Sequence, residues 1–186
     1  MEIIMQGLKE GLILIVNFDP QIWQVTILSL HVSLTALLIS AIIGIPAGAT
    51  LALTNMRGKT FLLNTTYTLM GLPPVIAGLF VYLFLTYRGP LGQYELLFTP
   101  TAMIIAQILL AIPIILGLTA RAVMTQPQDV YDTAATLGAT RGQAIRTILR
   151  ESRIGIVAAL TTALGRVIAE VGAVMLVGGN IKDRKS

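Results

Sequence analysis

Residues 127–153 read PQDVYDTAATLGATRGQAIRTILRESR and form the one long polar stretch in an otherwise apolar chain. Apolar residues recur in it at helical spacing, which predicts a short helix, a glycine-marked turn over residues 138–142 and a second helix that continues toward the next apolar span. Its charged residues are Asp129, Asp132, Arg141, Arg146, Arg150, Glu151 and Arg153. A short amphipathic helix of this kind can place one face in a partner's groove, whereas a solvated loop with helical character would need no partner.

The composition is that of a membrane protein. The chain has 186 residues, of which 55% are hydrophobic and 12% are charged, and average soluble domains carry about 25% charged residues. The absence of cysteine excludes disulfides and cysteine-based metal sites, and the single histidine, His31, cannot form a metal cluster alone. The net charge of +4 comes from basic residues in loops beside apolar spans, which indicates membrane topology rather than nucleic-acid binding.

Four apolar spans follow one another, at about residues 24–53, 61–86, 98–122 and 154–177. Each is long enough for a transmembrane helix, which needs about 20 residues. The acidic segment 1–20 lacks the basic start and the small-residue cleavage site of a signal peptide, and its apolar run is too short to span. We therefore predict an all-α, polytopic transmembrane bundle over residues 21–181, preceded by an interfacial helix at residues 1–20 and followed by a tail at residues 182–186.

Charge sets the predicted orientation in the membrane. Loops 55–59 and 121–153 each carry a net positive charge, segment 1–20 is acidic and loop 87–97 is neutral. Because cytoplasmic loops are enriched in lysine and arginine, the two basic loops are predicted to be cytoplasmic and the N-terminus external. Four spans then put the basic tail outside, against the same rule.

The second span is interrupted by the sequence Gly71-Leu72-Pro73-Pro74. Two adjacent prolines remove two backbone donors and strain the preceding turn, so the helix is predicted to break there. A break inside a membrane is tolerated only where it is buried in protein or faces water. Gly71, Pro73 and Pro74 therefore either belong to a transport path or its gate, or form a kink that only shapes the packing.

Arg166 and Glu170 lie four residues apart in the fourth span, on one helical face. Small residues throughout this span predict close packing near the centre of the bundle. Charges within a membrane are expensive and usually pair with each other, facing the bundle interior or water. Pairing favours a structural role that fixes the fourth span. The other interpretation is an element of the translocation path or gate, in which Arg166 offsets the charge of an anion.

The polar stretch resembles the EAA signature of ABC-importer permeases. Asp132, Thr133 and Ala134 stand at its Glu-Ala-Ala positions, Gly138 is its glycine and Ile148 its isoleucine, whereas residues 150–151 are Arg-Glu where the family has Leu-Pro. In that family this loop, here residues 124–153, is the coupling helix that docks into a cleft of the cytoplasmic ATPase subunit. The resemblance implies an ATPase-docking role for the following residues: Asp132, Thr133, Ala134, Leu137, Gly138, Arg141 and Ile148.

From about residue 7 to 181 the chain resembles the permease subunit of tungstate-type ABC importers, relatives of the molybdate and sulfate permeases. The likeness is carried by LSLHVSLT at 28–35, MGLPPV at 70–75, LFTPTA at 97–102, GRVIAEVGA at 165–173 and GGNI at 178–181. The resemblance implies a homodimer of type I importer permeases, two cytoplasmic ATPase subunits, an external oxyanion-binding protein, and no cofactor or metal. Such permeases usually continue into one more span after the Gly-Gly-Asn region, so the implied bundle has about four spans and lacks that final span.

The favoured interpretation is a multi-pass permease of the cell membrane that imports an oxyanion, tungstate first, by ATP-driven alternating access. The sequence contains no phosphate-binding Gly-Lys-Ser/Thr loop, so ATP hydrolysis is assigned to a separate subunit and the chain is not predicted to be an enzyme. The alternatives are a molybdate or sulfate permease, and a truncated, non-transporting membrane scaffold that binds a partner. A secondary transporter would usually show an inverted repeat, and we find no convincing one.

Overall fold

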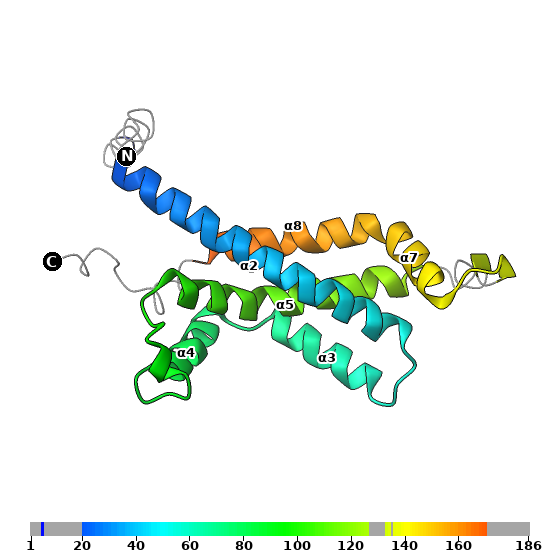
Figure 1. The fold of residues 1–186 in the computed structure, drawn as a ribbon, viewed down its shortest axis with the longest axis horizontal. Helices are drawn as coiled ribbons and strands as arrows, with labels where there is room; N and C mark the ends of the chain where they lie inside the picture. Colours follow the sequence, from blue (N-terminus) through cyan, green and yellow to red (C-terminus); the bar gives the residue numbers. More distant parts are fainter. Residues whose placement is uncertain (1–4, 6–19, 127–132, 135, 171–186) are drawn as a thin grey trace.

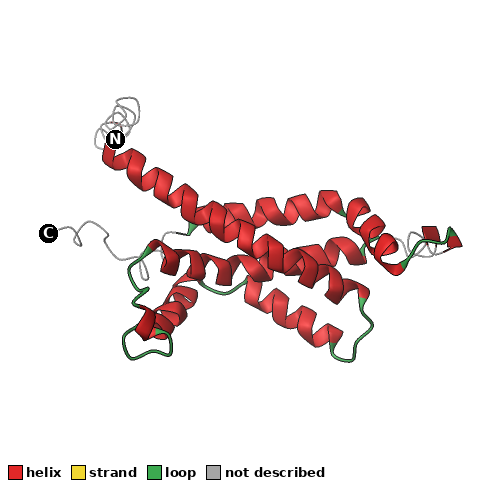
Figure 2. Ribbon diagram, in the orientation of Figure 1, coloured by secondary structure: helices red, strands yellow, loops and turns green. Residues whose placement is uncertain are grey.

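The structure, a computed structural model, describes residues 5, 20–126, 133, 134 and 136–170. Over these residues the chain is helical and contains no β-strand (Figure 1, Figure 2). The helical elements are α2 (Pro20–Leu53), α3 (Lys59–Met70), α4 (Pro74–Leu85), the 3₁₀ turn η1 (Gly92–Tyr94), α5 (Pro100–Met124), α7 (Arg141–Glu151) and α8 (Arg153–Ala169). The predicted all-α membrane bundle is confirmed. The predicted interfacial helix and tail lie outside the described residues, apart from Met5 and Pro20.

Two helices are each long and apolar enough to cross a membrane alone, α2 over Trp23–Leu53 and α5 over Pro100–Met124. Two bent pairs reach the necessary length together: α3 with α4, bent by 99°, and α7 with α8, bent by 64°. By length and composition, the described part of the chain therefore holds two spans, or four if each bent pair counts as one.

Helix α5 lies at the centre of the bundle, in contact with α2, α3, α4 and α8 (Figure 1). Its most extensive contact is with α2, which runs parallel to it. Gly44 and Gly48 allow this approach: a Cβ added at Gly48 would lie 2.4 Å from the carbonyl oxygen of Leu116. Small residues four positions apart let two membrane helices bring their backbones together. α8 runs the other way along α5, with Gly155 against Ala122.

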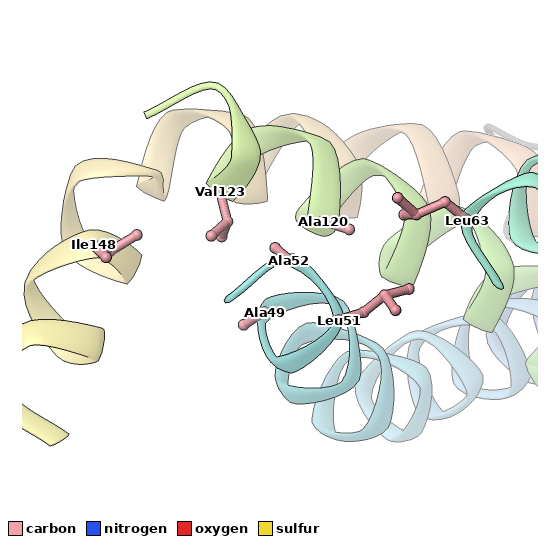
Figure 3. Packing of buried hydrophobic residues seen from close by; sticks show 7 residues of the cluster. All are labelled: Ala49, Leu51, Ala52, Leu63, Ala120, Val123 and Ile148. Carbon is pink, nitrogen blue, oxygen red and sulfur yellow. The ribbon is translucent and has the colours of Figure 1, made fainter. Parts of the chain in front are cut away.

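The described parts of the two basic loops lie at the same end of the bundle (Figure 1). There α2 ends, α3 begins and α5 ends, and α7 packs against them (Figure 1, Figure 3). A cluster of buried side chains joins these elements: Ala49, Leu51, Ala52, Leu63, Ala120, Val123 and Ile148. The side chain of Lys59 donates to the carbonyl of Ala52 and so caps the last turn of α2. This arrangement agrees with the predicted topology, which puts both basic loops on the same side of the membrane.

Of the fourth predicted span, residues 154–177, the structure describes residues 154–170, and these form α8 as far as Ala169. α8 ends at Ala169, and Glu170 leaves the helical region with φ −86° and ψ 89°. The N–H of Glu170 closes the last turn on the carbonyl of Val167 at 3.3 Å, and a side chain from α5 bonds to the same carbonyl. The carbonyl of Val167, one of the four at the end of α8, is thus satisfied without a further helical turn. Residues 171–177 lie outside the described residues.

Candidate functional site

The break in the second span is a corner of nearly a right angle. α3 and α4 meet at 99° across Gly71-Leu72-Pro73-Pro74, so the predicted break is confirmed. The N–H groups of Gly71 and Leu72 fold back to close the last turn of α3, and the carbonyl of Pro73 accepts the first bonds of α4. Each helix has only 12 residues, too few to cross a bilayer alone. The corner therefore lies partway along the path of the pair.

Arg166 of α8 reaches this corner. Its Nη2 donates to the carbonyl oxygen of Leu72 at 3.2 Å. A carbonyl in the corner has lost its helical donor, and a charged donor forms a stronger bond with it than a neutral one. The structure thus joins two features that the sequence presented separately, the intramembrane arginine and the broken helix.

Glu170 pairs with the same arginine. The Nε of Arg166 lies 3.0 Å from Oε1 of Glu170, and the two side chains are 35% and 10% exposed. The contact is ionic rather than a hydrogen bond, because Nε has no partner in hydrogen-bond geometry. The guanidinium is thereby held by a carboxylate on one side and by the Leu72 carbonyl on the other. In this conformation its charge is balanced by Glu170 within the protein, which fits the structural interpretation of the pair.

Gln107 of α5 is a residue of this site that the sequence alone did not identify as functional. Its side chain is 3% exposed, and its Nε2 donates to the carbonyl of Val167, next to Arg166, at 3.4 Å. The available signal was its position as one polar residue inside an apolar span. The carbonyl of Leu72 gave no signal of its own, because its accessibility depends on the angle of the corner.

The described part of the polar stretch turns at Gly138, as predicted, and a second helix follows. The turn is shorter than the predicted residues 138–142, because Arg141 and Gly142 already belong to α7, and the first predicted helix lies largely outside the described residues. Gly138 has φ +81°, in the left-handed region that glycine adopts without strain, and an added Cβ would meet nothing within 4 Å. Thr140 then caps α7: the N–H of Gln143 donates to Thr140 Oγ1 at 3.4 Å, and the N–H of Thr140 donates to Gln143 Oε1 at 2.8 Å. This reciprocal capping box fixes where α7 begins. The helix does not run straight into the next span, because it bends by 64° at Ser152.

The residues that the resemblance assigned to docking divide between two environments. Ile148 is 4% exposed and lies in the core cluster with the ends of α2 and α5 (Figure 3). Leu137 is 82% exposed, and Thr133 and Gly138 are also exposed. Ala134 is half-buried. Asp132 lies outside the described residues, as does the side chain of Arg141. One part of the set therefore forms an exposed turn, the Gly138 corner, which is distinct from the corner between α3 and α4. Ile148, in contrast, is buried in the core of this chain.

Neither part of the site holds a metal-ligating cluster among the described residues. The site contains an arginine in ionic contact with a carboxylate and a corner between α3 and α4 with exposed backbone. Helices α8 and α7 connect this corner to the exposed turn at Gly138. This arrangement suits conformational change of the helices and compensation of charge rather than the making or breaking of covalent bonds.

The sequence matches a known family along most of its length. The family described as "Binding-protein-dependent transport system inner membrane component" matches residues 44–183. The chain is 44% identical over 182 residues to the tungstate uptake system permease protein TupB of Peptoclostridium acidaminophilum, covering 98% of this chain and 80% of that protein. It is 44% identical over 157 residues to a probable anion ABC transporter permease protein of Haloferax volcanii, covering 84% of this chain and 68% of that protein. It is 31% identical over 182 residues to TupB of Campylobacter jejuni, covering 98% and 76% respectively.

Proposed function

The chain belongs to the family of binding-protein-dependent transport system inner membrane components, and on that premise we propose that it is the permease of an ATP-driven importer for tungstate. Its place is the membrane, as its family and its apolar helices require. The names of its relatives, tungstate uptake permeases and a probable anion permease, support an oxyanion substrate. Transport, not catalysis, is the activity of this subunit, and ATP hydrolysis belongs to a partner.

One observation carries the coupling part of the proposal. α7 buries Ala144 and Ile148 in the chain's own core, at 1% and 4% exposure, while the corner before it exposes Leu137 at 82%. A helix that is anchored on one side and presents an exposed apolar corner on the other suits transmission of movement between two subunits. Leu137 gives this turn an apolar side chain that a groove on a partner could bury.

The proposed mechanism follows the contacts from that corner into the bundle. Closure of the ATPase moves the corner at Gly138, and Ile148 carries the movement to the ends of α2 and α5. The bend at Ser152 passes it to α8, whose far end bears Arg166 and contacts the break at Leu72. A change there shifts α4 relative to α3 and opens or closes the path for the anion. Gly71, Pro73, Pro74, Arg166 and Glu170 are the proposed gate residues.

The partners are proposed from the same premise. An ABC ATPase subunit would bind the Gly138 corner, and an external oxyanion-binding protein would deliver the anion to the opposite end. A second permease copy would complete the path. The exposed side of α8 carries small residues that allow close helix packing: Ala158, Thr161, Gly165 and Ala169. These partners remain proposals for this chain.

The test is uptake of radiolabelled tungstate by host cells in which this chain is the only permease of its type, with competition by excess molybdate or sulfate. We expect saturable tungstate uptake that depends on cellular ATP and is lost in Gly138→Glu. The matched control is Gly142→Ala, four residues away, where an added Cβ meets no atom within 4 Å and φ is not positive. A membrane-inserted wild type without uptake of any of the three anions would refute the proposal and leave the scaffold alternative.

A molybdate or sulfate permease is the second candidate, since the chain resembles that wider group and the external binding protein selects the anion. The same competition separates the two. Stronger inhibition by molybdate or sulfate than by unlabelled tungstate would reassign the substrate without affecting the coupling part of the proposal.

A further inference from the structure

Gln107 of α5 lies in the candidate site, but the mechanism proposed above assigns it no part. Its side chain is 3% exposed, its Nε2 donates to the carbonyl of Val167 at 3.4 Å, and its Oε1 has no partner among the described residues. Burying an amide with half of its hydrogen-bonding capacity unused costs free energy, and a methionine of similar volume would fill the space without that cost. Packing alone therefore gives no reason for glutamine here, and the bond to Val167 is the feature to explain.

Val167 and Arg166 are neighbours in the last turn of α8. Gln107 holds the first through its carbonyl, and Arg166 reaches the Leu72 carbonyl in the break at 3.2 Å. The carbonyl of Val167 points along the helix axis, as helix carbonyls do, whereas the side chain of Arg166 projects outward from the helix. Two contacts made from neighbouring positions in different directions fix both the position and the rotation of that turn. The end of α8 is thus tied to α5 by one hydrogen bond and to the corner between α3 and α4 by the other.

The opposite end of α8 is held by packing. A Cβ at Gly155 would lie 2.5 Å from the Cβ of Ala122, so α8 and α5 are in close contact there. Ala159, Ala163 and Val167 continue this buried side toward the break, each at 0% exposure. Small side chains permit sliding and rotation between two helices more easily than interlocked large ones, because they form shallow ridges. The polar bond of Gln107 is the directional contact that fixes the rotation at the end nearest the break.

We propose that Gln107 is a positioning residue: it holds the last turn of α8 on α5 in the rotation that lets Arg166 reach Leu72. A movement of α8 is then transmitted to the break between α3 and α4. Without the bond from Gln107 to the Val167 carbonyl, α8 rotates without moving α4. The consequence for transport rests on the proposed function above. The geometric statement concerns this chain alone and is tested separately.

The first experiment measures the distance between α4 and the end of α8 by pulsed electron paramagnetic resonance in nanodiscs. The chain contains no cysteine, so spin labels at Leu79→Cys and Ile168→Cys, two exposed positions, are the only ones attached. We expect a narrow distance distribution that broadens in Gln107→Met and in Arg166→Gln. Thr119→Val is the matched control, because Thr119 is also on α5, is 0% exposed, and its hydroxyl has no partner among the described residues. It should leave the distribution unchanged.

The second experiment measures tungstate uptake by the same variants at equal amounts in the membrane. We expect Gln107→Met to lose about fivefold in uptake, the factor that one hydrogen bond of about 1 kcal/mol sets between two states, and Thr119→Val to match the wild type. An unchanged distance distribution in Gln107→Met, or equal broadening in Thr119→Val, overturns the positioning role. So does failure of Gln107→Met to insert, which would make Gln107 a requirement of the fold, or wild-type uptake in that variant. If the wild type takes up no oxyanion, the proposed function fails while the distances still decide the positioning role.

Discussion

Replacing Gly48 by alanine tests the packing on which the bundle depends. A Cβ at this position would lie 2.4 Å from the carbonyl oxygen of Leu116, 3.0 Å from Cβ of Thr119 and 3.1 Å from the amide nitrogen of Ala120. Two of these three atoms belong to the backbone of α5, so no side-chain rotation relieves the clash. The contact between α2 and α5 must open instead.

The magnitude follows from these distances. A carbon–oxygen contact settles at about 3.4 Å, so the two backbones must separate by about 1 Å where they now touch. Overpacking of this kind costs about 1–3 kcal/mol, and the rigid backbone places this site near the upper value. Alanine in a helix interior recovers about 1 kcal/mol relative to glycine. We therefore expect Gly48→Ala to lower the free energy of unfolding by about 2 kcal/mol.

The assay is unfolding of the purified chain in mixed micelles by sodium dodecyl sulfate, followed by circular dichroism. Two other glycines give a graded series. At Gly44 the added Cβ would lie 3.0 Å from Cγ2 of Ile115, a side-chain atom that can move, so Gly44→Ala should cost less than Gly48→Ala. At Gly165 it would meet nothing within 4 Å, so Gly165→Ala should be neutral or stabilising. Equal stability of Gly48→Ala and Gly165→Ala would refute the close α2–α5 packing.

Five further substitutions, in three groups, test other parts of the structure. Ile148→Ala should lower the free energy of unfolding by about 3 kcal/mol, because it empties a buried core position. Leu137→Ala, at an exposed position, should change it by no more than about 0.5 kcal/mol and should lower only the retention of the ATPase in detergent. The reverse pattern would contradict the placement of α7. Of the two ion-pair variants, Arg166→Gln should be less stable than Glu170→Gln by about 2 kcal/mol in the same unfolding assay. Arg166→Gln leaves the carboxylate of Glu170 buried without its partner, whereas Glu170→Gln keeps the bond of Arg166 to the Leu72 carbonyl. Equal stability of the two variants would argue against the Arg166–Leu72 bond. Thr140→Ala removes the capping box and should destabilise α7 by about 1 kcal/mol. Amide hydrogen exchange should then become faster in α7 alone. Unchanged exchange would show that the cap is not needed.

The helices could be predicted from hydropathy because each long apolar run has one stable solution in a bilayer, a helix that satisfies its own backbone. The break at Pro73 and Pro74 could be predicted for a local reason, the missing N–H groups. Its angle could not be predicted, because the packing of α4 on α5 decides it. The end of α8 at Ala169 could not be predicted for a similar reason, since the carbonyl of Val167 near this end accepts a hydrogen bond from Gln107, 60 residues away in sequence.

The candidate site shows the same division. The spacing of Arg166 and Glu170 was enough to predict their pairing, because the two residues are four positions apart at the end of α8, where Glu170 is the C-cap. The contact of Arg166 with Leu72 joins residues 94 positions apart and appears only once α8 lies along α5. For the coupling stretch, the sequence predicted the glycine turn. The burial of Ile148 depends on where α2 and α5 end, and no local pattern distinguishes an isoleucine that faces a partner from one that faces the chain's own core.

The docking of an ATPase at the Gly138 corner is the central claim, and site-specific photo-crosslinking tests it most directly. A benzophenone probe attached at Leu137→Cys, in this chain without other cysteines, should crosslink to an ABC ATPase subunit in host membranes and respond to ATP. The same probe at Tyr87→Cys, which is 90% exposed in the α4–α5 connection, is the control and should give no such product. A product of ATPase size from Leu137→Cys alone is the predicted result. No product from Leu137→Cys, or the same product from both positions, would contradict the account.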